Sequence, residues 1–282
     1  MRWRGERESS NIEDRRGMSA GRVAVGGGLG GLLLLILALA FGIDPQALFD
    51  QTQNEPPAQV QTSRPQNAEE EELKQFVSVV LAKSEDVWHD VFRRNGREYR
   101  EPTLVLFTDQ VQSACGIRGA AVGPFYCPGD EKVYIDLSFY EQLRRQFNSP
   151  GDFAQAYVVA HEVGHHVQKL LGISDRVEAM ESRASEVEAN QLSVRLELQA
   201  DFFAGVFARY VQNQGLLEAG DIEEALRAAS AVGDDQIQRR TTGYVVPDSF
   251  THGTSAQRLR WFKKGFDTGD MRQGDTFNTP NL

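Results

Sequence analysis

Residues 161–168 read HEVGHHVQ and contain three of the five histidines of the chain. The pattern of apolar residues over 152–171 predicts a helix through this stretch. His161 and His165 are four positions apart, so they share one face of that helix, displaced by only about 40°. His166 lies about 140° from His161 by the same arithmetic and faces elsewhere. Two imidazoles that converge on one point indicate a bound ligand rather than a polar helix face, which remains the alternative.

Glu162 directly follows the first of these histidines. The pattern H-E-x-x-H is the signature of zinc peptidases, in which the glutamate acts as general base. Gly164 lies in the middle of the predicted helix, where glycine costs about 1 kcal/mol relative to alanine. We therefore expect another part of the chain to pack closely against it.

A catalytic zinc ion needs a third protein ligand and an open position for water. Histidine downstream is limited to His252, so a carboxylate is the better donor. The candidate glutamates are Glu178, Glu181, Glu186, Glu188 and Glu197. Glu197 and Asp201 are four apart in an otherwise apolar stretch, where two acids would be costly unless they bind something. We predict that one binds the metal and the other orients a ligating histidine, while the remaining glutamates are exposed.

The 282-residue chain is 40% hydrophobic, enough for one large domain or two small ones. Its formal net charge of −10 argues against nucleic acid as a partner, because phosphate binding needs a clustered excess of Lys and Arg. Helices dominate the predicted elements, with a small sheet, so the expected fold class is α+β. We predict helices over 73–92, 138–147, 152–171, 185–211 and 255–265, a further one opening at Asp221, and strands over 103–107 and 132–137.

The N-terminal part differs from the rest. Residues 23–43 form an uncharged stretch of 21 residues, and a membrane-spanning helix needs about 20. Arginines are frequent in residues 1–22, and the next basic residue is Arg64. This asymmetry predicts a single-pass protein of the cell membrane, with residues 1–22 in the cytoplasm and the remainder on the periplasmic side. A cleaved signal peptide is the alternative, since residues 38–40 (ALA) resemble a processing site.

Residues 44–72 are rich in Gln, Pro, Asn and acidic residues, which predicts a flexible linker before a folded domain over 73–282. Cys115 and Cys127 lie on the predicted outer side, where an oxidising compartment favours a disulfide. Closing so short a loop would stabilise the fold by about 3 kcal/mol in the chain-entropy model. Two free thiols or half of a metal site are the alternatives.

Several segments together resemble the bacterial predicted neutral zinc metallopeptidase family. They are HEVGHHVQ (161–168), VRLELQADFFAG (194–205), PDSFTHGTSAQR (247–258) and the opening MRWRGERES (1–9) and NIEDRRG (11–17). That family is similar to the gluzincins, so the resemblance implies a mainly helical, zincin-like domain that binds one zinc ion. It assigns the metal to His161, His165 and Glu197, the base role to Glu162, and the support of a ligating histidine to Asp201. The chain departs from many relatives at Phe202, where a cysteine is expected.

The expected function is that of a membrane-anchored zinc endopeptidase acting on peptides or proteins. An extended substrate would add to an exposed strand edge, for which residues 132–137 are the candidate because they precede the zinc-binding helix. A zinc hydrolase of a non-peptide bond and a catalytically inactive zinc-binding scaffold of the envelope are the alternatives. Nothing in the sequence indicates the oligomeric state.

His252 and Arg258 are candidates for stabilising the negative charge that develops on the substrate carbonyl. Their spacing resembles the H-P-x-x-x-x-R segment of membrane prenyl-protein endopeptidases, with Gly253 in place of the proline. A donor beside such an oxygen contributes about 10²–10³ in rate. The alternative is that both residues cap or pin the last helix.

Overall fold

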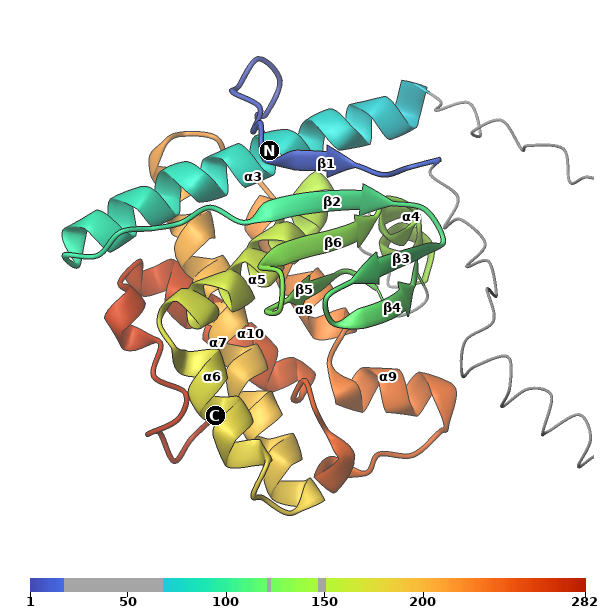
Figure 1. Cartoon of the computed structure of the whole chain (residues 1–282), viewed down its shortest axis with the longest axis vertical. Coiled ribbons are helices and arrows are strands. Elements are labelled where there is room, and N and C mark those ends of the chain that lie inside the picture. Colours follow the sequence, from blue (N-terminus) through green and yellow to red (C-terminus); the bar gives the residue numbers. More distant parts are fainter. Residues whose placement is uncertain (18–67, 121–122, 147–150) are drawn as a thin grey trace, which may run out of the picture. The chain divides into compact units, whose positions relative to one another are not determined.

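The computed structural model describes residues 1–17, 68–120, 123–146 and 151–282. A four-stranded sheet has the order β1-β2-β6-β5 (Figure 1). Its strands are β1 (Ile12–Asp14), β2 (Thr103–Phe107), β5 (Phe125–Cys127) and β6 (Lys132–Asp136). Strands β1 and β6 run parallel to β2, while β5 is antiparallel to β6 and forms one edge. Strands β3 (Gln110–Ser113) and β4 (Gly116–Gly119) form a separate antiparallel hairpin.

Helices supply most of the remaining structure, which confirms the predicted mainly helical α+β class. The α-helices are α3 (Ala68–Arg94), α4 (Ser138–Gln146), α5 (Asp152–Leu170), α6 (Ile173–Glu181), α7 (Glu186–Asn213), α8 (Asp221–Ala231), α9 (Asp234–Thr241) and α10 (Ser255–Thr268). Two short 3₁₀ helices are η2 (Pro247–Ser249) and η3 (Met271–Gln273). The elements that the sequence analysis did not predict are β1, the β3–β4 hairpin, β5, α6 and α9.

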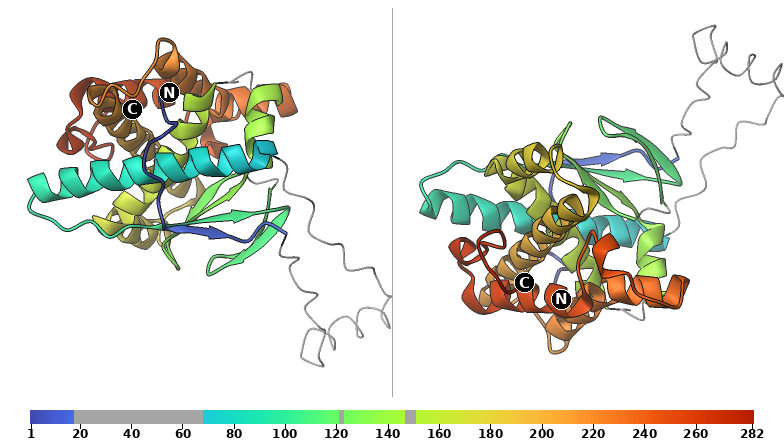
Figure 2. Two further views of the ribbon diagram at one scale, coloured as in Figure 1. Left: turned by 90° about the horizontal axis from the view of Figure 1, so that it is seen from above. Right: turned by 90° about the horizontal axis from the view of Figure 1, so that it is seen from below.

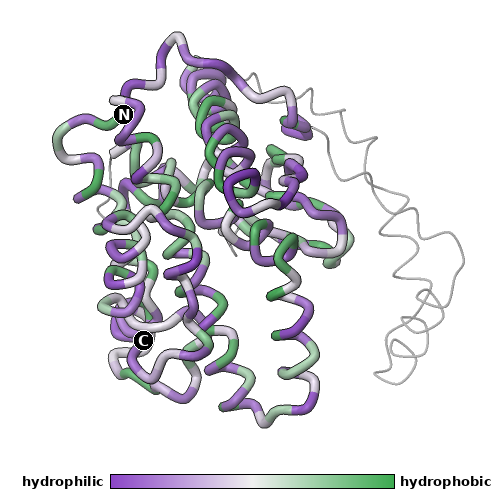
Figure 3. Tube along the Cα trace, turned by 90° about the vertical axis from the view of Figure 1, so that its left-hand side faces the viewer, coloured by the Kyte–Doolittle hydropathy of each residue, from purple (hydrophilic) through white to green (hydrophobic). Residues whose placement is uncertain are grey.

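Strands β2 and β6 bury side chains on both faces, because successive residues of a strand point to opposite sides. Leu104 and Ile135 join the main core with α3 and α5. Val105 and Tyr134 face the other way and form a second, smaller core with Val111 of the hairpin. In Figure 3, hydrophobic and hydrophilic residues alternate along the helices, as expected for helices that bury one side.

Helix α7 packs against both α5 and α10. At Gly164 of α5, a Cβ atom would lie 3.0 Å from the backbone oxygen of Ala200 in α7. This confirms the predicted close packing. Helix α7 begins at a capping box in which Ser185 and Glu188 each bind the other's backbone N–H group. Glu188 therefore has a structural role at the exposed start of this helix.

Residues 1–15 belong to the folded domain, which corrects the predicted division of the chain. Strand β1 pairs with β2, and Arg7 donates a hydrogen bond to the buried carboxylate of Glu85 in α3. Figure 2 shows this segment crossing α3 before it joins the sheet. One compact unit thus contains residues 1–15 together with the chain from residue 68 onward, rather than residues 73–282 alone.

The predicted single membrane crossing does not fit this sheet. The predicted anchor, residues 23–43, lies outside the described residues, and of the predicted linker only residues 68–72 are described, at the start of α3. One crossing between residues 15 and 68 would put β1 and β2 on opposite sides of a membrane, although the two strands are paired. None of the helices in the described ranges is long and apolar enough to span a bilayer.

The sheet edge also differs from the prediction. Strand β6 lies between β2 and β5, so residues 132–137 do not offer a free edge; β5 does. Strand β5 could not be predicted, because a stretch of three residues is too short to show the alternation of apolar and polar residues.

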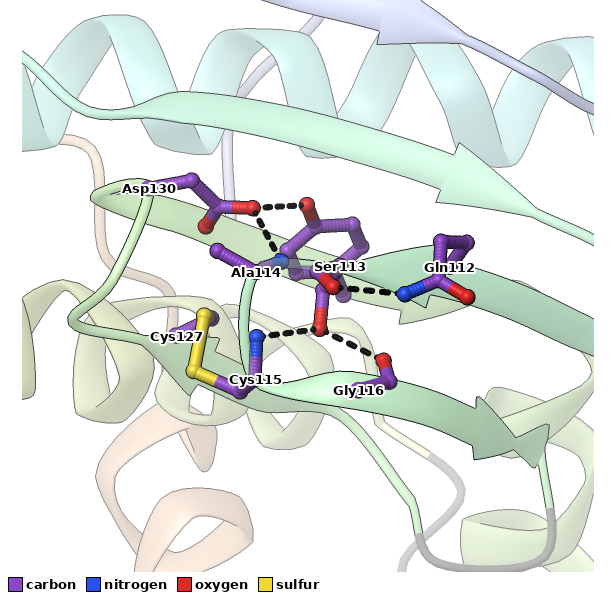
Figure 4. Close-up of a disulfide and its surroundings, with 8 residues drawn as sticks. Gln112, Ser113, Ala114, Cys115, Gly116, Cys127 and Asp130 are labelled. Atoms are coloured by element: carbon purple, nitrogen blue, oxygen red, sulfur yellow. Dashed lines mark hydrogen bonds between the residues drawn. A yellow bond between two sulfur atoms is a disulfide. The ribbon is translucent and has the colours of Figure 1, made fainter. Parts of the chain in front are cut away.

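The predicted disulfide between Cys115 and Cys127 is present and joins the β3–β4 turn to β5 (Figure 4). The same turn is fixed by Ser113, whose hydroxyl accepts from the Cys115 N–H group and donates to the Gly116 carbonyl. Asp130, just before β6, accepts a hydrogen bond from the Ala114 N–H group. The disulfide and these hydrogen bonds hold the hairpin against the edge strand.

Candidate metal centre

The predicted ligands converge on one point between α5 and α7. The Nε2 atom of His161 lies 3.1 Å from Oε2 of Glu197, and Nε2 of His165 lies 3.3 Å from Oε1 of the same carboxylate. In a tetrahedral zinc site with bonds of about 2.0–2.1 Å, neighbouring ligand atoms lie roughly 3.3–3.4 Å apart. Two imidazoles and one carboxylate are also a donor set that zinc prefers. The residues therefore fit a zinc ion in both spacing and chemistry.

The Nδ1 atom of each ligating histidine forms a hydrogen bond within the protein, so the Nε2 atoms are left for the metal. His161 donates from Nδ1 to Oδ1 of Asp201 at 3.0 Å, as the assignment of Asp201 requires. His165 donates from Nδ1 to Oε1 of Gln168 at 2.9 Å. Gln168 is fully buried, and its Nε2 atom donates to the Leu196 carbonyl, which can only accept. That bond fixes the amide so that its oxygen faces His165.

Asp201 lies at the centre of a buried network behind His161. Arg258 of α10 donates from Nε to Oδ2 of Asp201 at 2.8 Å and from Nη2 to Oδ1 at 3.1 Å. Tyr157 donates its hydroxyl to Oδ1 of the same carboxylate and accepts from Arg258. Burial raises the pKa of Asp201, but Arg258 and His161 outweigh it and keep that pKa below its usual range.

The electrostatics of the ligands favour a cation between them. Burial disfavours a charge on His161, yet Asp201 and Glu197 outweigh it and raise the pKa of His161 to about 10. Burial likewise opposes ionisation of Glu197, but the two ligating histidines hold its pKa well below the usual range. The carboxylates of Glu197 and Asp201 thus require positive charge near them. A divalent metal would supply that charge while both histidines stay neutral.

Glu162 lies beside the ligands, in a cleft of about 770 Å³ that it lines with the two ligating histidines. Its carboxylate takes part in no hydrogen bond or ion pair among the residues that the structure places. A carboxylate without a protein partner next to the metal position is suited to accept a proton from a water molecule in the cleft. The other candidate glutamates, Glu178, Glu181, Glu186 and Glu188, do not join the histidine pair in the described ranges.

His252 and Arg258 have different surroundings, although both border the cleft. The side chain of His252 is 50% exposed, and its Nδ1 atom lies 3.3 Å from Oδ1 of Asp234. Hydrogen bonding to Asp234 raises the pKa of His252. Arg258, in contrast, is buried and directs its donors at Asp201, Tyr157 and the Val232 carbonyl. Neither residue caps α10, because Thr254 and Gln257 form the capping box there.

Three further residues near the ligands were not predicted from the sequence: Gln168, Tyr157 and Tyr126. The first two had a signal: Gln168 is three positions after one ligand and Tyr157 four before the other, so each shares a face with that ligand. Tyr126 had none, since it reaches His166 from another element. His166 is buried, and burial lowers its pKa.

Comparisons with known proteins identify the family of this chain. The family model described as "Putative neutral zinc metallopeptidase" matches residues 1–277. The chain is 51% identical to the "Uncharacterized protein YpfJ" of Escherichia coli (strain K12) over 287 residues, covering 98% of this chain and 99% of that protein. It is 46% identical to the "Uncharacterized protein Rv2575" of Mycobacterium tuberculosis (strain H37Rv) over 195 residues, 65% of each chain. No solved structure matches significantly. By this match over nearly its whole length, the chain belongs to the "Putative neutral zinc metallopeptidase" family.

Proposed function

We propose that this protein is a zinc-dependent endopeptidase that hydrolyses peptide bonds through a metal-activated water, with one zinc ion held by His161, His165 and Glu197. The observation that carries the proposal is the convergence of three ligand atoms in the same open cleft as Glu162, whose carboxylate has no partner among the described residues. A zinc site with a purely structural role is normally closed by four protein ligands, whereas three ligands beside a cleft leave a position for water.

Each residue has a definite task in this proposal. Zinc would supply a water of lowered pKa and polarise the substrate carbonyl. Glu162 accepts the water's proton and can deliver it to the leaving amine. His252 donates a hydrogen bond from Nε2 to the carbonyl oxygen as that oxygen gains negative charge, while Asp234 orients the ring through Nδ1. Arg258 acts through Asp201 rather than on the substrate, since its donors point at Asp201 and Tyr157.

The substrate would bind in an extended conformation along the free edge of β5. Phe125 and Tyr126 of β5 line the cleft that contains Glu162, together with residues 123–124 just before the strand. An unpaired strand edge offers backbone donors and acceptors in a row, so a peptide can add to it as a further strand. This replaces the predicted edge at residues 132–137, which is already paired on both sides.

Attachment to a membrane through residues 23–43 and a periplasmic location of the domain are also part of the proposal. The apolar, uncharged character of this stretch supports the first, and the disulfide supports the second. The pairing of β1 with β2 adds a condition: residues 1–15 and the domain from residue 68 onward occupy the same side.

Hydrolysis of casein tests the function. The purified protein is expected to cleave casein with zinc, to lose this activity when a chelator removes the metal, and to regain it on zinc addition. Hydrolysis of ester substrates but not of casein would favour a non-peptide hydrolase. A protein that binds zinc and cleaves neither would be a scaffold.

A further inference from the structure

The third histidine of HEVGHHVQ links the zinc-binding helix to the edge strand of the sheet. His166 follows the ligand His165 in α5, but its ring points away from the metal position and is fully buried. Its Nε2 atom lies 2.6 Å from the backbone oxygen of Arg100, and its Nδ1 atom lies 3.0 Å from the hydroxyl of Tyr126 in β5. A carbonyl oxygen can only accept, so Nε2 carries the proton. In the neutral ring, Nδ1 therefore accepts a hydrogen bond from Tyr126.

This hydrogen bond joins two parts of the cleft that must keep a fixed separation. Tyr126 is the middle residue of β5, which has only three residues and pairs with β6 along one side. Phe125 and Tyr126 of this strand line the cleft. His166 belongs to the same helix as the ligands and Glu162, one residue beyond His165. The bond between Tyr126 and His166 thus spans from the cleft edge of the sheet to the helix that carries the metal ligands.

We propose that His166 and Tyr126 are positioning residues that hold the edge of β5 at a set distance from the metal site, so that a peptide bound along this edge presents its carbonyl to Glu162. The inference rests on the proposed function. Tyr126 lines the cleft, but its hydroxyl hydrogen is used in the bond to His166, so this role does not require it to donate to the substrate. The disulfide at Cys127 fixes the end of β5 to the hairpin, while His166 fixes its middle to the helix.

Tyr126→Phe tests the proposal because it removes only the hydroxyl. We expect the amides within residues 123–128, which are those of Gly123, Phe125, Tyr126 and Cys127 because residues 124 and 128 are prolines, to exchange with deuterium several-fold faster than in the wild type. We also expect KM for a peptide substrate to rise about fivefold with kcat nearly unchanged, since one neutral hydrogen bond contributes about 1 kcal/mol. Zinc content should stay at that of the wild type, because no ligand or its support is touched.

Tyr99→Phe is the matched control. Tyr99 is also buried and its ring packs edge-on against His166, with the centroids 5.8 Å apart. Its hydroxyl has no hydrogen-bond partner among the described residues, so its removal should alter neither the exchange at 123–128 nor KM. The amide of the His166→Gln variant can still donate to the Arg100 carbonyl and accept from the Tyr126 hydroxyl. The amides within residues 123–128 should therefore exchange more slowly in this variant than in His166→Leu.

The two readouts separate this inference from the proposed function. Unchanged exchange and unchanged KM in Tyr126→Phe would overturn the positioning role. A fall in zinc content or kcat with unchanged KM would overturn it as well, since the residue would then act on the metal site. If the wild type cleaves no peptide, the proposed function fails, and the exchange measurement alone decides whether His166 fixes β5.

Discussion

The Nδ1 atom of His161 lies 3.0 Å from Oδ1 of Asp201, and the same carboxylate is held by Arg258 from a third helix. One metal ligand on α5 is thus oriented by a residue of α7, which is in turn oriented by a residue of α10. The chain brings together positions 161, 201 and 258 in a site whose side chains are nearly all excluded from water.

Asp201→Asn is expected to weaken zinc binding about 10- to 100-fold, because an amide cannot both hold the His161 N–H group and balance Arg258. Titration with a competing chelator measures the change. Asp267→Asn is the control, since Asp267 is exposed on α10 and, within the part of the chain that the structure describes, pairs with Lys263 one turn away rather than with the site. Equal zinc affinity in the two variants would contradict the role of Asp201.

Glu197→Ala is expected to lower zinc content sharply, because it removes one of three protein ligands. Glu188→Ala should keep its zinc, since Glu188 only caps the start of α7. Metal analysis of both purified proteins decides between them. Loss of zinc from the Glu188 variant alone would show that a different carboxylate binds the metal.

These ligands could be predicted from the sequence because helical spacing fixes which side chains share a face. His161 and His165 on one helix, and Glu197 and Asp201 on another, follow from the four-residue interval and from the apolar residues around the acidic pair. The pattern of apolar residues likewise predicted the main helices and both central strands, because that pattern is strong in these segments.

The remaining features depend on contacts between distant segments. No local pattern indicates that residues 12–14 form a strand beside residues 104–106. Arg258 and His252 resembled two equal candidates in the sequence, but the packing of α10 against α7 buries the first and leaves the second half-exposed. The uncharged stretch at 23–43 predicted a single crossing, since a hydropathy pattern alone cannot show that its two flanks are paired.

His252→Ala is expected to lower kcat about 10²-fold with unchanged zinc content, the size of effect seen when one oxyanion donor is lost. Assay of kcat beside metal analysis and thermal melting checks this. An early melting transition with proportionally reduced activity would instead assign the loop a structural role.

The pH dependence of stability gives a second readout at the same residue. Asp234 raises the pKa of His252 above its usual value of about 6.5. The folded state therefore holds this proton more tightly, so the stabilisation is complete below about pH 6.5 and is lost as pH rises through the raised pKa. The difference in melting temperature between wild type and His252→Gln should be larger at pH 6 than at pH 9.

Reporters of compartment fused before Met1 and after Leu282 are expected to indicate the same side of the membrane, because β1 and β2 share one sheet. The mature protein should retain residues 1–15, since cleavage after Ala40 would remove β1. Thiol labelling should find Cys115 and Cys127 unreactive until they are reduced. Reporters on opposite sides would show that β1 does not pair with β2 in the cell.

The central claim is that Glu162 is the base of a zinc peptidase, and Glu162→Gln tests it most directly. The amide has almost the same shape but cannot accept the water's proton, and general-base catalysis contributes about 10²–10⁴ in rate. Casein hydrolysis and zinc content are measured on the same preparation of the variant. We predict full zinc occupancy with hydrolysis reduced at least 10²-fold; near-normal hydrolysis at full occupancy would contradict the mechanism.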